Sequence, residues 1–322
     1  MEKPLFWIID DEWPDYSVET AELKAAYPDC EIKISGLPFD EDLAVYGPKA
    51  DAVLAQITAD LNGDVIRQLT NCKGIAVFGS GYNNVDIKAA KECGIPVTNV
   101  NGYCSEDIAD YVLAAIFHFY KRIPQLSENI GNGIWGAQAL PGPVHRLSHQ
   151  TLLLMGFGHI GKVTAFRAQA LGMKVMAYDP FVPPEAISQW GVIPVSLEEG
   201  LAAADYVSVH VKLTEETKGL IGRSVFEKMK NSAILINVAR GPLVKEDELI
   251  EAVEQGVIAG AVLDVVDKEP ISPDSPLLKV KNILITPHIS YASEDAIIDL
   301  RTRAVHNALT MYRGETPADL VR

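Results

Sequence analysis

One ten-residue stretch, LLLMGFGHIG at residues 152–161, constrains the fold of this chain more than any other. Its first four residues are apolar, which is typical of a parallel strand whose two faces are both covered. Gly156, Gly158 and Gly161 then complete the pattern G-x-G-x-x-G. The first glycine permits a tight turn, the second lets the backbone approach a phosphate, and the third lets a helix pack closely on the strand. The stretch therefore predicts a strand–turn–helix unit whose helix N-terminus can bind a pyrophosphate.

The residues that follow support the same interpretation. A second predicted strand, Lys174–Tyr178, ends at Asp179, where a carboxylate can accept hydrogen bonds from an adenosine ribose. The same carboxylate would repel a 2′-phosphate, so we expect NAD rather than NADP. Alone, the glycines are equally consistent with an ordinary turn, and it is the strand and acid in register that favour a dinucleotide. The intervening helix is expected to bury an apolar stripe of Ile160, Val163, Phe166 and Ala170.

Short apolar runs alternate with helical segments along most of the 322 residues, which predicts an α/β protein with parallel sheets and room for two domains. Strand candidates in the first hundred residues are Leu5–Asp10, Glu31–Ser35, Ala52–Ile57, Gly74–Phe78 and Pro96–Val100. Later strand candidates are Leu152–Met155, Lys174–Tyr178, Tyr206–Val211, Ala233–Val238, Ala259–Val265 and Ile283–Thr286.

Two long helices are expected outside the strand series. The first, Ser105–Arg122, would begin with Ser105 as its N-cap and could join two domains. Its apolar face would be Ile108, Tyr111, Val112, Ala115, Ile116 and Phe119. The second helix covers 294–312. Residues 125–150 are rich in glycine, proline and polar residues, and we expect a surface connection there, anchored by Trp135 and Leu140.

The composition excludes several classes of partner. The formal net charge is −15, so the surface should repel nucleic acid and anionic membranes, and an anionic substrate would need local cations. No run reaches the ~18 apolar residues of a membrane span, and the N-terminus does not resemble a signal peptide. The spacing of the cysteines predicts buried, reduced thiols in a cytoplasmic protein and no metal site. These cysteines are Cys30, Cys72, Cys93 and Cys104.

Three residues that follow predicted strands can be joined into one mechanism: Arg240 in NVARG, Glu269 in DKEP and His288 in TPHIS. Each has a plain structural alternative, namely a solvated charge, a turn residue and a capping group. Ligands of open α/β sheets collect at the carboxyl ends of the strands. The occurrence of all three residues at such ends therefore favours a functional site.

Six segments resemble the NAD-dependent D-2-hydroxyacid dehydrogenases, a family that includes phosphoglycerate dehydrogenase. They are GSGYNNVDI, GFGHIG with YDP, SVHVKLTEET, INVARGPLV, AVLDVVDKEP and ITPHIS, in this order from about residue 75 to the end. Three stretches, GSGYNNVDIKAA, ADYVLAAIFHFYKR and PHISYASE, are most similar to the branch that contains the C-terminal-binding-protein corepressors. Residues 1–74 agree with the family only in pattern.

The resemblance implies two Rossmann-like or flavodoxin-like domains with parallel sheets and an active-site cleft between them. Residues 1–100 plus 291–322 would form the substrate domain, and residues 101–290 the NAD-binding domain, through which the protein would form a homodimer. The implied activity is hydride transfer between NAD(H) and a small D-2-hydroxy or 2-keto acid, such as hydroxypyruvate, glyoxylate or 3-phosphohydroxypyruvate.

The resemblance also implies roles for individual residues. His288 would be the general acid/base, Glu269 would pair with it, and Arg240 would bind the substrate carboxylate bidentately. Backbone N–H groups of Gly79, Ser80 and Gly81 would bind the other side of that carboxylate. Tyr291 would border the substrate, and residues 10–13 and 56–57 would shape its pocket. The expected cofactor contacts are Ser80, Ser105, Gly156, Gly158, His159, Ile160, Gly161, Asp179, His210, Val238, Ala239, Arg240, Asp264 and His288.

A few residues depart from the family pattern. His159 stands where Arg or Lys is usual, so the affinity for the pyrophosphate would fall as pH rises. Asn101 and Lys212 each replace a common proline, while Glu269 separates the chain from formate-oxidising relatives, which have Gln there. A second function stays open, an NADH-sensing binding module of the corepressor type with little turnover. Turnover of 2-keto acids with NADH distinguishes the two.

Overall fold

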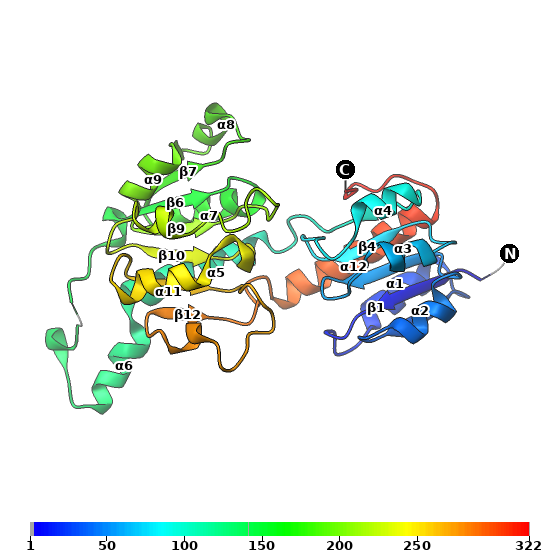
Figure 1. Ribbon diagram of the computed structural model, residues 1–322, viewed down its shortest axis with the longest axis horizontal. Coiled ribbons are helices and arrows are strands. Elements are labelled where there is room, and N and C mark those ends of the chain that lie inside the picture. The colour runs from blue at the N-terminus through cyan, green and yellow to red at the C-terminus, as the bar shows by residue number, and fades with distance from the viewer. Residues whose placement is uncertain (1–2, 141, 322) are drawn as a thin grey trace. The chain divides into compact units, whose positions relative to one another are not determined.

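A computed structural model describes residues 3–140 and 142–321 and divides the chain into two compact units (Figure 1). The first unit spans Met1–Tyr103 and Ser293–Arg322, and the second spans Cys104–Ala292, so the chain passes between the units twice. Each unit contains one sheet in which the paired strands are parallel. The α/β class expected from the alternation of apolar runs is therefore confirmed.

The first unit has the strand order β2-β1-β3-β4-β5. Its strands are β1 (Leu5–Ile9), β2 (Glu31–Ser35), β3 (Ala52–Gln56), β4 (Ile75–Phe78) and β5 (Val97–Thr98). Its helices are α1 (Ser17–Ala26), α2 (Asp40–Tyr46), α3 (Gly63–Gln68), α4 (Ile87–Glu92) and α12 (Glu294–Tyr312).

Both faces of this sheet are buried, as the continuous apolar runs predict. On β1, Trp7 and Ile9 pack in a cluster that includes residues of α2, α3 and α4. Phe6 and Ile8 point to the opposite face, where they pack with Leu23 of α1 and with α12. Helix α12 begins just over 200 residues after the end of α4, yet it contributes most of the helical residues that pack on this face. Both faces are covered because parallel strands are apolar on both sides.

The second unit has the strand order β12-β11-β10-β9-β6-β7-β8. Its strands are β6 (Thr151–Met155), β7 (Lys174–Tyr178), β8 (Ile193–Pro194), β9 (Tyr206–Val209), β10 (Ile234–Asn237), β11 (Gly260–Leu263) and β12 (Ile283–Ile285). Its α-helices are α5 (Ser105–Lys121), α6 (Ile123–Gly131), α7 (His159–Ala170), α8 (Pro184–Ser188), α9 (Leu197–Ala203), α10 (Arg223–Phe226) and α11 (Glu246–Glu254). Short 3₁₀ turns are η1 (Gly136–Ala139), η2 (Leu147–His149), η3 (Gly241–Leu243) and η4 (Pro276–Lys279).

The strand order of the second unit reverses beside β6, which has β7 on one side and β9 on the other. The chain first moves outward from β6 to β7 and β8, then returns to the other side for β9 to β12. Such a reversal leaves a crevice at the carboxyl ends of the strands, where open α/β sheets bind ligands. The glycine pattern follows β6 directly, so it lies at this point.

The expected buried face of α7 is wrong. The residues it buries are Gly161, Thr164, Ala165 and Ala168, whereas Phe166 is 66% exposed. A Cβ on Gly161 would lie 2.7 Å from the carbonyl oxygen of Gly156. The helix therefore packs so closely on the sheet that only small side chains fit its inner face, and large apolar residues point outward.

The expectations for residues 105 and 125–150 also need correction. Cys104, not Ser105, is the N-cap of α5, because its carbonyl already accepts the first helical bond, from Ile108 N. Arg122 has a left-handed backbone (φ 50°) that ends α5, and α6 follows with Pro124 in its first turn, where the missing N–H is tolerated. Part of the predicted surface connection is thus helical.

Trp135 and Leu140 do not anchor their segment, since they are 75% and 45% exposed. All four cysteines are free, but Cys93 is exposed rather than buried. Within residues 3–140 and 142–321, no helix has both the length and the apolar character that crossing a membrane requires.

Candidate active site

Four neighbouring strands of the second unit deliver chemically active side chains to one edge of the sheet. His210 follows β9, Arg240 follows β10, Asp264 and Glu269 follow β11, and His288 follows β12. These strands are adjacent and parallel. Their carboxyl ends therefore meet at the same edge, which brings together residues that are up to 78 positions apart in the sequence.

His288 and Glu269 form a hydrogen-bonded pair. Nδ1 of His288 lies 2.8 Å from Oε2 of Glu269, and Oε1 of Glu269 accepts a bond from the Val266 N–H at 3.0 Å. Burial by itself would raise the pKa of Glu269, but the hydrogen bond and charge of His288 outweigh it, and the pKa is lowered. An ionised Glu269 accepts the Nδ1 proton, so Nε2 is the ring nitrogen left to exchange a proton with a substrate.

Arg240 belongs to the same charged group. Its Nη1 donates to the carbonyl of Ala239 at 2.7 Å, and its own carbonyl accepts a bond from the Asn237 side chain at 3.0 Å. The charge of Arg240 contributes to the lowered pKa of Glu269. The structure thus brings together the three residues predicted to be catalytic.

The turn after β6 has the shape that a dinucleotide requires. Gly156 has a φ of 98°, and a Cβ there would lie 2.7 Å from the carbonyl oxygen of His210. Gly158 is the N-cap of α7, and a Cβ there would meet nothing within 4 Å, so the space beside it is open. The first N–H groups of a helix have no acceptor within the helix, so His159 and Ile160 can present theirs to a phosphate.

Asp179 is fixed at the end of β7 by this same turn. Its Oδ2 accepts a bond from the Phe157 N–H at 2.8 Å, and its Oδ1 accepts one from the Phe181 N–H at 2.9 Å. Each carboxylate oxygen can accept a second bond, so the ribose hydroxyls expected here have acceptors available. The acid and the glycine turn therefore form one site, and these residues fit a bound NAD.

His210 borders the glycine turn and is held as a neutral ring. Its Nε2 lies 3.0 Å from the hydroxyl of Ser208, while its Nδ1 is buried without a partner among the described residues. Burial lowers the pKa of His210 to about 4. Val238 is buried and Ala239 half-buried at the end of β10, where we expected them to pack on the cofactor. Ser105 is buried at the start of α5, and its hydroxyl has no hydrogen-bond partner among the described residues.

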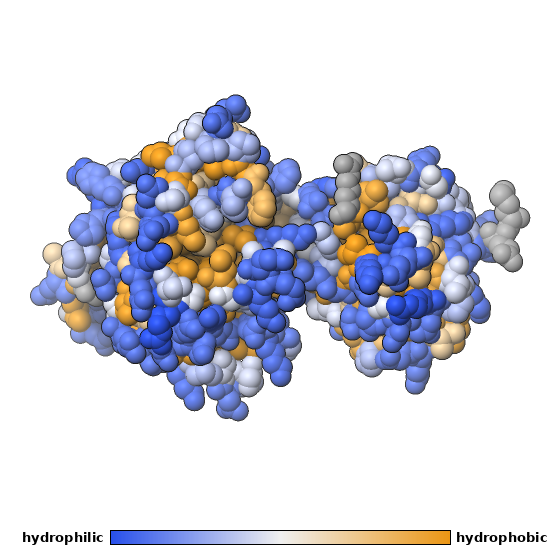
Figure 2. Space-filling model, turned by 45° about the horizontal axis from the view of Figure 1, so that its top comes forward, coloured by the Kyte–Doolittle hydropathy of each residue, from blue (hydrophilic) through white to orange (hydrophobic). Residues whose placement is uncertain are grey.

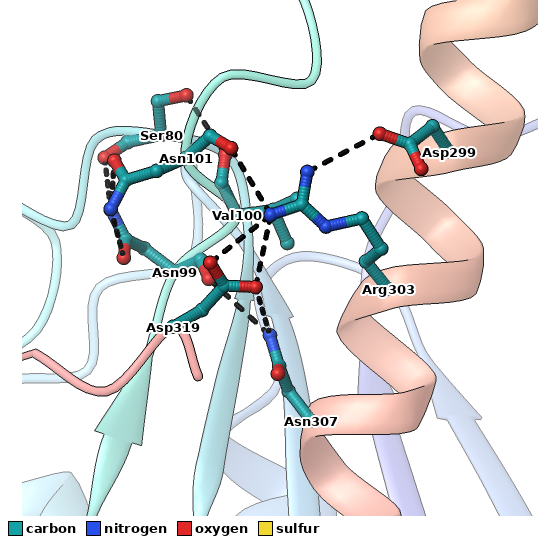
Figure 3. A network of polar contacts seen from close by, with 8 residues as sticks. All are labelled: Ser80, Asn99, Val100, Asn101, Asp299, Arg303, Asn307 and Asp319. Atoms are coloured by element: carbon teal, nitrogen blue, oxygen red, sulfur yellow. Dashed lines mark hydrogen bonds and ion pairs between the residues drawn. The ribbon is translucent and has the colours of Figure 1, made fainter. Parts of the chain in front are cut away.

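The loop Gly79–Gly81 belongs to the first unit and is held there by polar contacts (Figure 3). The Ser80 hydroxyl donates to the carbonyl of Val100 at 2.9 Å, and the Ser80 carbonyl accepts a bond from the Asn99 side chain at 2.6 Å. Arg303 of α12 binds both carboxylate oxygens of Asp319 at 3.0 Å and donates to the carbonyl of Asn101 at 3.1 Å. Asn101, which replaces a proline common in the family, thus helps to hold this loop in place.

Among the residues expected to shape the substrate pocket, Asp10 has a structural role. It is buried, and its carboxylate accepts bonds from the N–H groups of Glu12 and Trp13 and from the hydroxyl of Tyr16. Glu12 in turn accepts a bond from the buried Gln56 at 3.1 Å. Asp10 therefore fixes the turn after β1, and Glu12 and Gln56 are the polar groups at the neighbouring strand ends.

The family model for the NAD-binding domain of D-isomer specific 2-hydroxyacid dehydrogenases matches residues 113–290. This chain belongs to the D-isomer specific 2-hydroxyacid dehydrogenases. A D-3-phosphoglycerate dehydrogenase from Archaeoglobus fulgidus is 38% identical over 284 residues, which cover 88% of this chain and 54% of that protein. A glyoxylate reductase from Korarchaeum cryptofilum is 35% identical over 273 residues, which cover 84% of this chain and 82% of that protein.

A solved structure agrees with this assignment. The crystal structure of a glyoxylate reductase from Paecilomyes thermophila matches with a TM-score of 0.86 and 26% identity, covering 100% of this chain and 99% of that chain. The dehydrogenase described here is thus an NAD-dependent enzyme of this family. The chain spans about half the length of the phosphoglycerate dehydrogenase relative.

Two polar residues of the dehydrogenase are linked to the segment that carries His288, although the sequence did not suggest a place for them in the site. Tyr111, counted as part of the apolar face of α5, hydrogen-bonds through its hydroxyl to Thr286. Thr286, taken as the last residue of a strand, donates to Asp264 at 2.6 Å. The chain offers no local signal for either contact, because Tyr111 and Thr286 are 175 residues apart.

Proposed function

We propose that this dehydrogenase reduces a small 2-keto acid with NADH, and oxidises the D-2-hydroxy acid in the reverse direction, using His288, Glu269 and Arg240. The observation that carries the proposal is the His288–Glu269 pair, 2.8 Å apart, at the same sheet edge as Arg240. An imidazole with its Nδ1 proton held by a carboxylate is a suitable general acid/base, since Nε2 can give up or take a proton.

Each residue then has a definite task. Bound NADH supplies the hydride that reaches the carbonyl carbon. His288 donates the proton from Nε2 to the carbonyl oxygen, and the Glu269 carboxylate stabilises the charged ring while fixing its orientation. The Arg240 guanidinium binds the substrate carboxylate with two parallel N–H bonds, which a lysine cannot provide. In the first unit, the N–H groups of the loop Gly79–Gly81 are donors of the kind that a carboxylate accepts.

The substrate class follows from the charge of these groups and from the names of the relatives. A cation and a set of N–H donors suit a carboxylate beside a carbonyl. The glyoxylate reductase and phosphoglycerate dehydrogenase relatives act on acids of this kind by their names, and we propose glyoxylate, hydroxypyruvate or 3-phosphohydroxypyruvate for this enzyme. Tyr291, whose ring packs edge-on against that of His288 with centroids 6.3 Å apart, would border the substrate.

The proposal is tested by mixing the purified enzyme with NADH and a panel of 2-keto acids while following NADH absorbance. We expect turnover of at least one of them. Binding of NADH without turnover on any would contradict the proposal and favour the corepressor-type binding module. At the residue level, Arg240→Ala should lower kcat/KM by at least about a hundredfold, since a carboxylate loses its charged partner. Arg223→Ala, which removes an arginine from a surface ion pair with Glu251, is the matched control.

We further propose that the enzyme is a homodimer in which the second unit contacts a second copy of the chain. Figure 2 shows apolar side chains interrupting the polar surface of this unit. On and after α6, Ile123, Ile130 and Trp135 are 67%, 58% and 75% exposed. Several exposed large apolar side chains in one segment of the chain support an interface with another protein. Light scattering should give twice the chain mass, and Ile130→Glu should shift it towards a monomer, whereas Ile298→Glu, at an exposed position of the first unit, should not.

The four free thiols are compatible with a cytoplasmic location, which we also propose. Fractionation of the source cells would test it, and recovery of the enzyme outside the cytoplasm would contradict it.

A further inference from the structure

We propose that Tyr111 is a positioning residue for the acid/base His288, acting through a hydrogen-bonded chain that runs from the Tyr111 hydroxyl through Thr286 to Asp264. The proposal rests on the role proposed above for His288. All four residues belong to the second unit, and the chain joins the N-terminal half of α5 to the segment that follows β12.

The backbone at His288 adopts a conformation that needs outside support. Its φ is 53°, in the left-handed region that residues with a Cβ avoid. Such a conformation persists only where the surrounding contacts determine it. The ring that exchanges the proton is thus carried by a bend whose geometry depends on what holds residues 286–290 in place.

Asp264 is the centre of that support. Its carboxylate is 1% exposed and accepts bonds from the Ile289 N–H at 2.9 Å, the Ser290 N–H at 2.8 Å and the Thr286 hydroxyl at 2.6 Å. Its backbone carbonyl accepts the His288 N–H at 2.8 Å. The segment around His288 therefore wraps one buried carboxylate, with bonds on both sides of the bend.

The proton positions in the chain can be assigned by counting donors. An ionised carboxylate only accepts, so the single hydroxyl proton of Thr286 goes to Asp264. The hydroxyl of Thr286 then has no proton for Tyr111, and Tyr111 must donate across the 2.5 Å contact. Burial, together with the nearby Asp264 charge, raises the pKa of Tyr111, so its donor proton stays in place through the working pH range.

The hydrogen bond that Tyr111 donates to Thr286 affects the next bond in the chain, because hydrogen bonds in series strengthen one another in a site of low dielectric. Tyr111 polarises the Thr286 hydroxyl, which then binds Asp264 more tightly and fixes the bend. A misplacement of about 1 Å at a reacting group can cost roughly a hundredfold in rate. Since Glu269 binds only Nδ1 of the ring, the backbone bend decides where Nε2 lies, and the chain acts on the chemical step rather than on binding of NADH.

The experiment compares four variants with the wild type. Tyr111→Phe removes the first donor, Thr286→Val removes the central hydroxyl, Thr286→Ser restores it, and a double variant combines Tyr111→Phe with Thr286→Val. Tyr206→Phe is the matched control, because Tyr206 is a buried tyrosine of the same unit that lies at the amino-terminal end of β9, whereas the site residues follow the carboxyl ends of their strands. For each variant, kcat and KM for the 2-keto acid, Kd for NADH and the unfolding temperature are measured.

We expect Tyr111→Phe to lower kcat about five- to tenfold, as the loss of one neutral hydrogen bond implies, with Kd for NADH within twofold of wild type. Thr286→Val should lower kcat further, and Thr286→Ser should restore it to within about threefold of wild type. The double variant should be no slower than Thr286→Val, since residues that act in series are not additive. Tyr206→Phe should keep wild-type kcat.

Three outcomes would overturn the proposal. The first is a wild-type kcat in Tyr111→Phe, the second is no rescue by Thr286→Ser, and the third is additive losses in the double variant. A His288→Gln variant measured alongside separates this proposal from the proposed function. If His288→Gln is inactive and Tyr111→Phe is unchanged, only the positioning role fails. If His288→Gln retains turnover, the acid/base assignment fails, and the positioning role fails with it.

Discussion

Substitution by alanine should have different effects at two glycines of the same turn: weaker NADH binding at Gly158 and lower stability at Gly161. The difference tests where the cofactor binds. At Gly158 a methyl group would meet nothing within 4 Å, and the backbone is extended at φ −78°. At Gly161 the methyl carbon would lie 2.7 Å from the Gly156 carbonyl oxygen, whereas ordinary van der Waals contact begins at 3.4 Å. The first substitution therefore fills open space, and the second pushes α7 away from the turn.

The magnitudes follow from these contacts. Gly161→Ala overpacks a close helix–sheet contact, which costs about 1–3 kcal/mol. For a unit of this size that lowers the unfolding temperature of the ligand-free enzyme by roughly 2–12 °C. Gly158→Ala should leave that temperature unchanged but block the approach of a phosphate to the backbone. Loss of one hydrogen bond to a charged group is worth about 1.5–3 kcal/mol, so Kd for NADH should rise at least about tenfold.

The assays are thermal unfolding without ligand and calorimetric titration with NADH, applied to both variants and to Gly131→Ala. Gly131, at the end of α6, is the matched control, because a Cβ there also meets nothing within 4 Å and the residue lies outside the turn. Wild-type NADH affinity in Gly158→Ala would show that the pyrophosphate does not lie over this glycine. An unchanged unfolding temperature in Gly161→Ala would show that the packing argument is wrong.

Three further predictions concern the cofactor site. Asp179 should give NADH a kcat/KM at least tenfold above that of NADPH, about 1.4 kcal/mol, and equal values for the two cofactors would refute this. His159→Ala should raise Kd for NADH, because His159 is the first residue of α7, beside the expected position of the pyrophosphate; an identical Kd in variant and wild type would remove that role. Burial lowers the pKa of His210 from 6.5 to about 4, so between these values the unfolded chain binds a proton that the folded chain does not. Stability should therefore fall as pH drops through this window, and denaturant unfolding at pH 7 and pH 5 should show wild type losing about 2 kcal/mol more than His210→Asn; parallel losses in the two proteins would contradict the assignment.

The local pattern of the chain was sufficient for most of the elements. Continuous apolar runs predicted the strands, because a parallel strand must be apolar on both faces wherever it pairs. The glycine spacing predicted the turn after β6, since a φ of 98° at Gly156 and the close approach at Gly161 exclude other residues regardless of the rest of the fold. The positions of Arg240, Glu269 and His288 after strands could also be predicted, because each residue follows an apolar run in the sequence.

The pattern failed where packing distance, rather than apolarity, decides which side is buried. On α7 the helix lies so close to the sheet that Ala165 and Ala168 face inward and Phe166 faces solvent. Hydrophobic periodicity weights large residues, so it selected the wrong face. Trp135 was likewise expected to be an anchor, but it is 75% exposed. Apolarity alone does not determine whether a side chain packs against its own chain or faces solvent.

The stretch LLLMGFGHIG, together with Asp179, determined a dinucleotide site from the sequence alone. This was possible because a turn and its flanking strands depend on residues that are neighbours in the chain. Only the tertiary structure decided which groups support the proposed acid/base. Tyr111 meets Thr286 across 175 residues, and Asp264 gathers its donors from the end of the next strand. These contacts depend on the order of strands in the sheet and on the helix that packs beside it. The sequence identified Tyr111 only as part of an apolar face, and the hydrogen bond of its hydroxyl became evident only in the tertiary structure, which places Thr286 next to it.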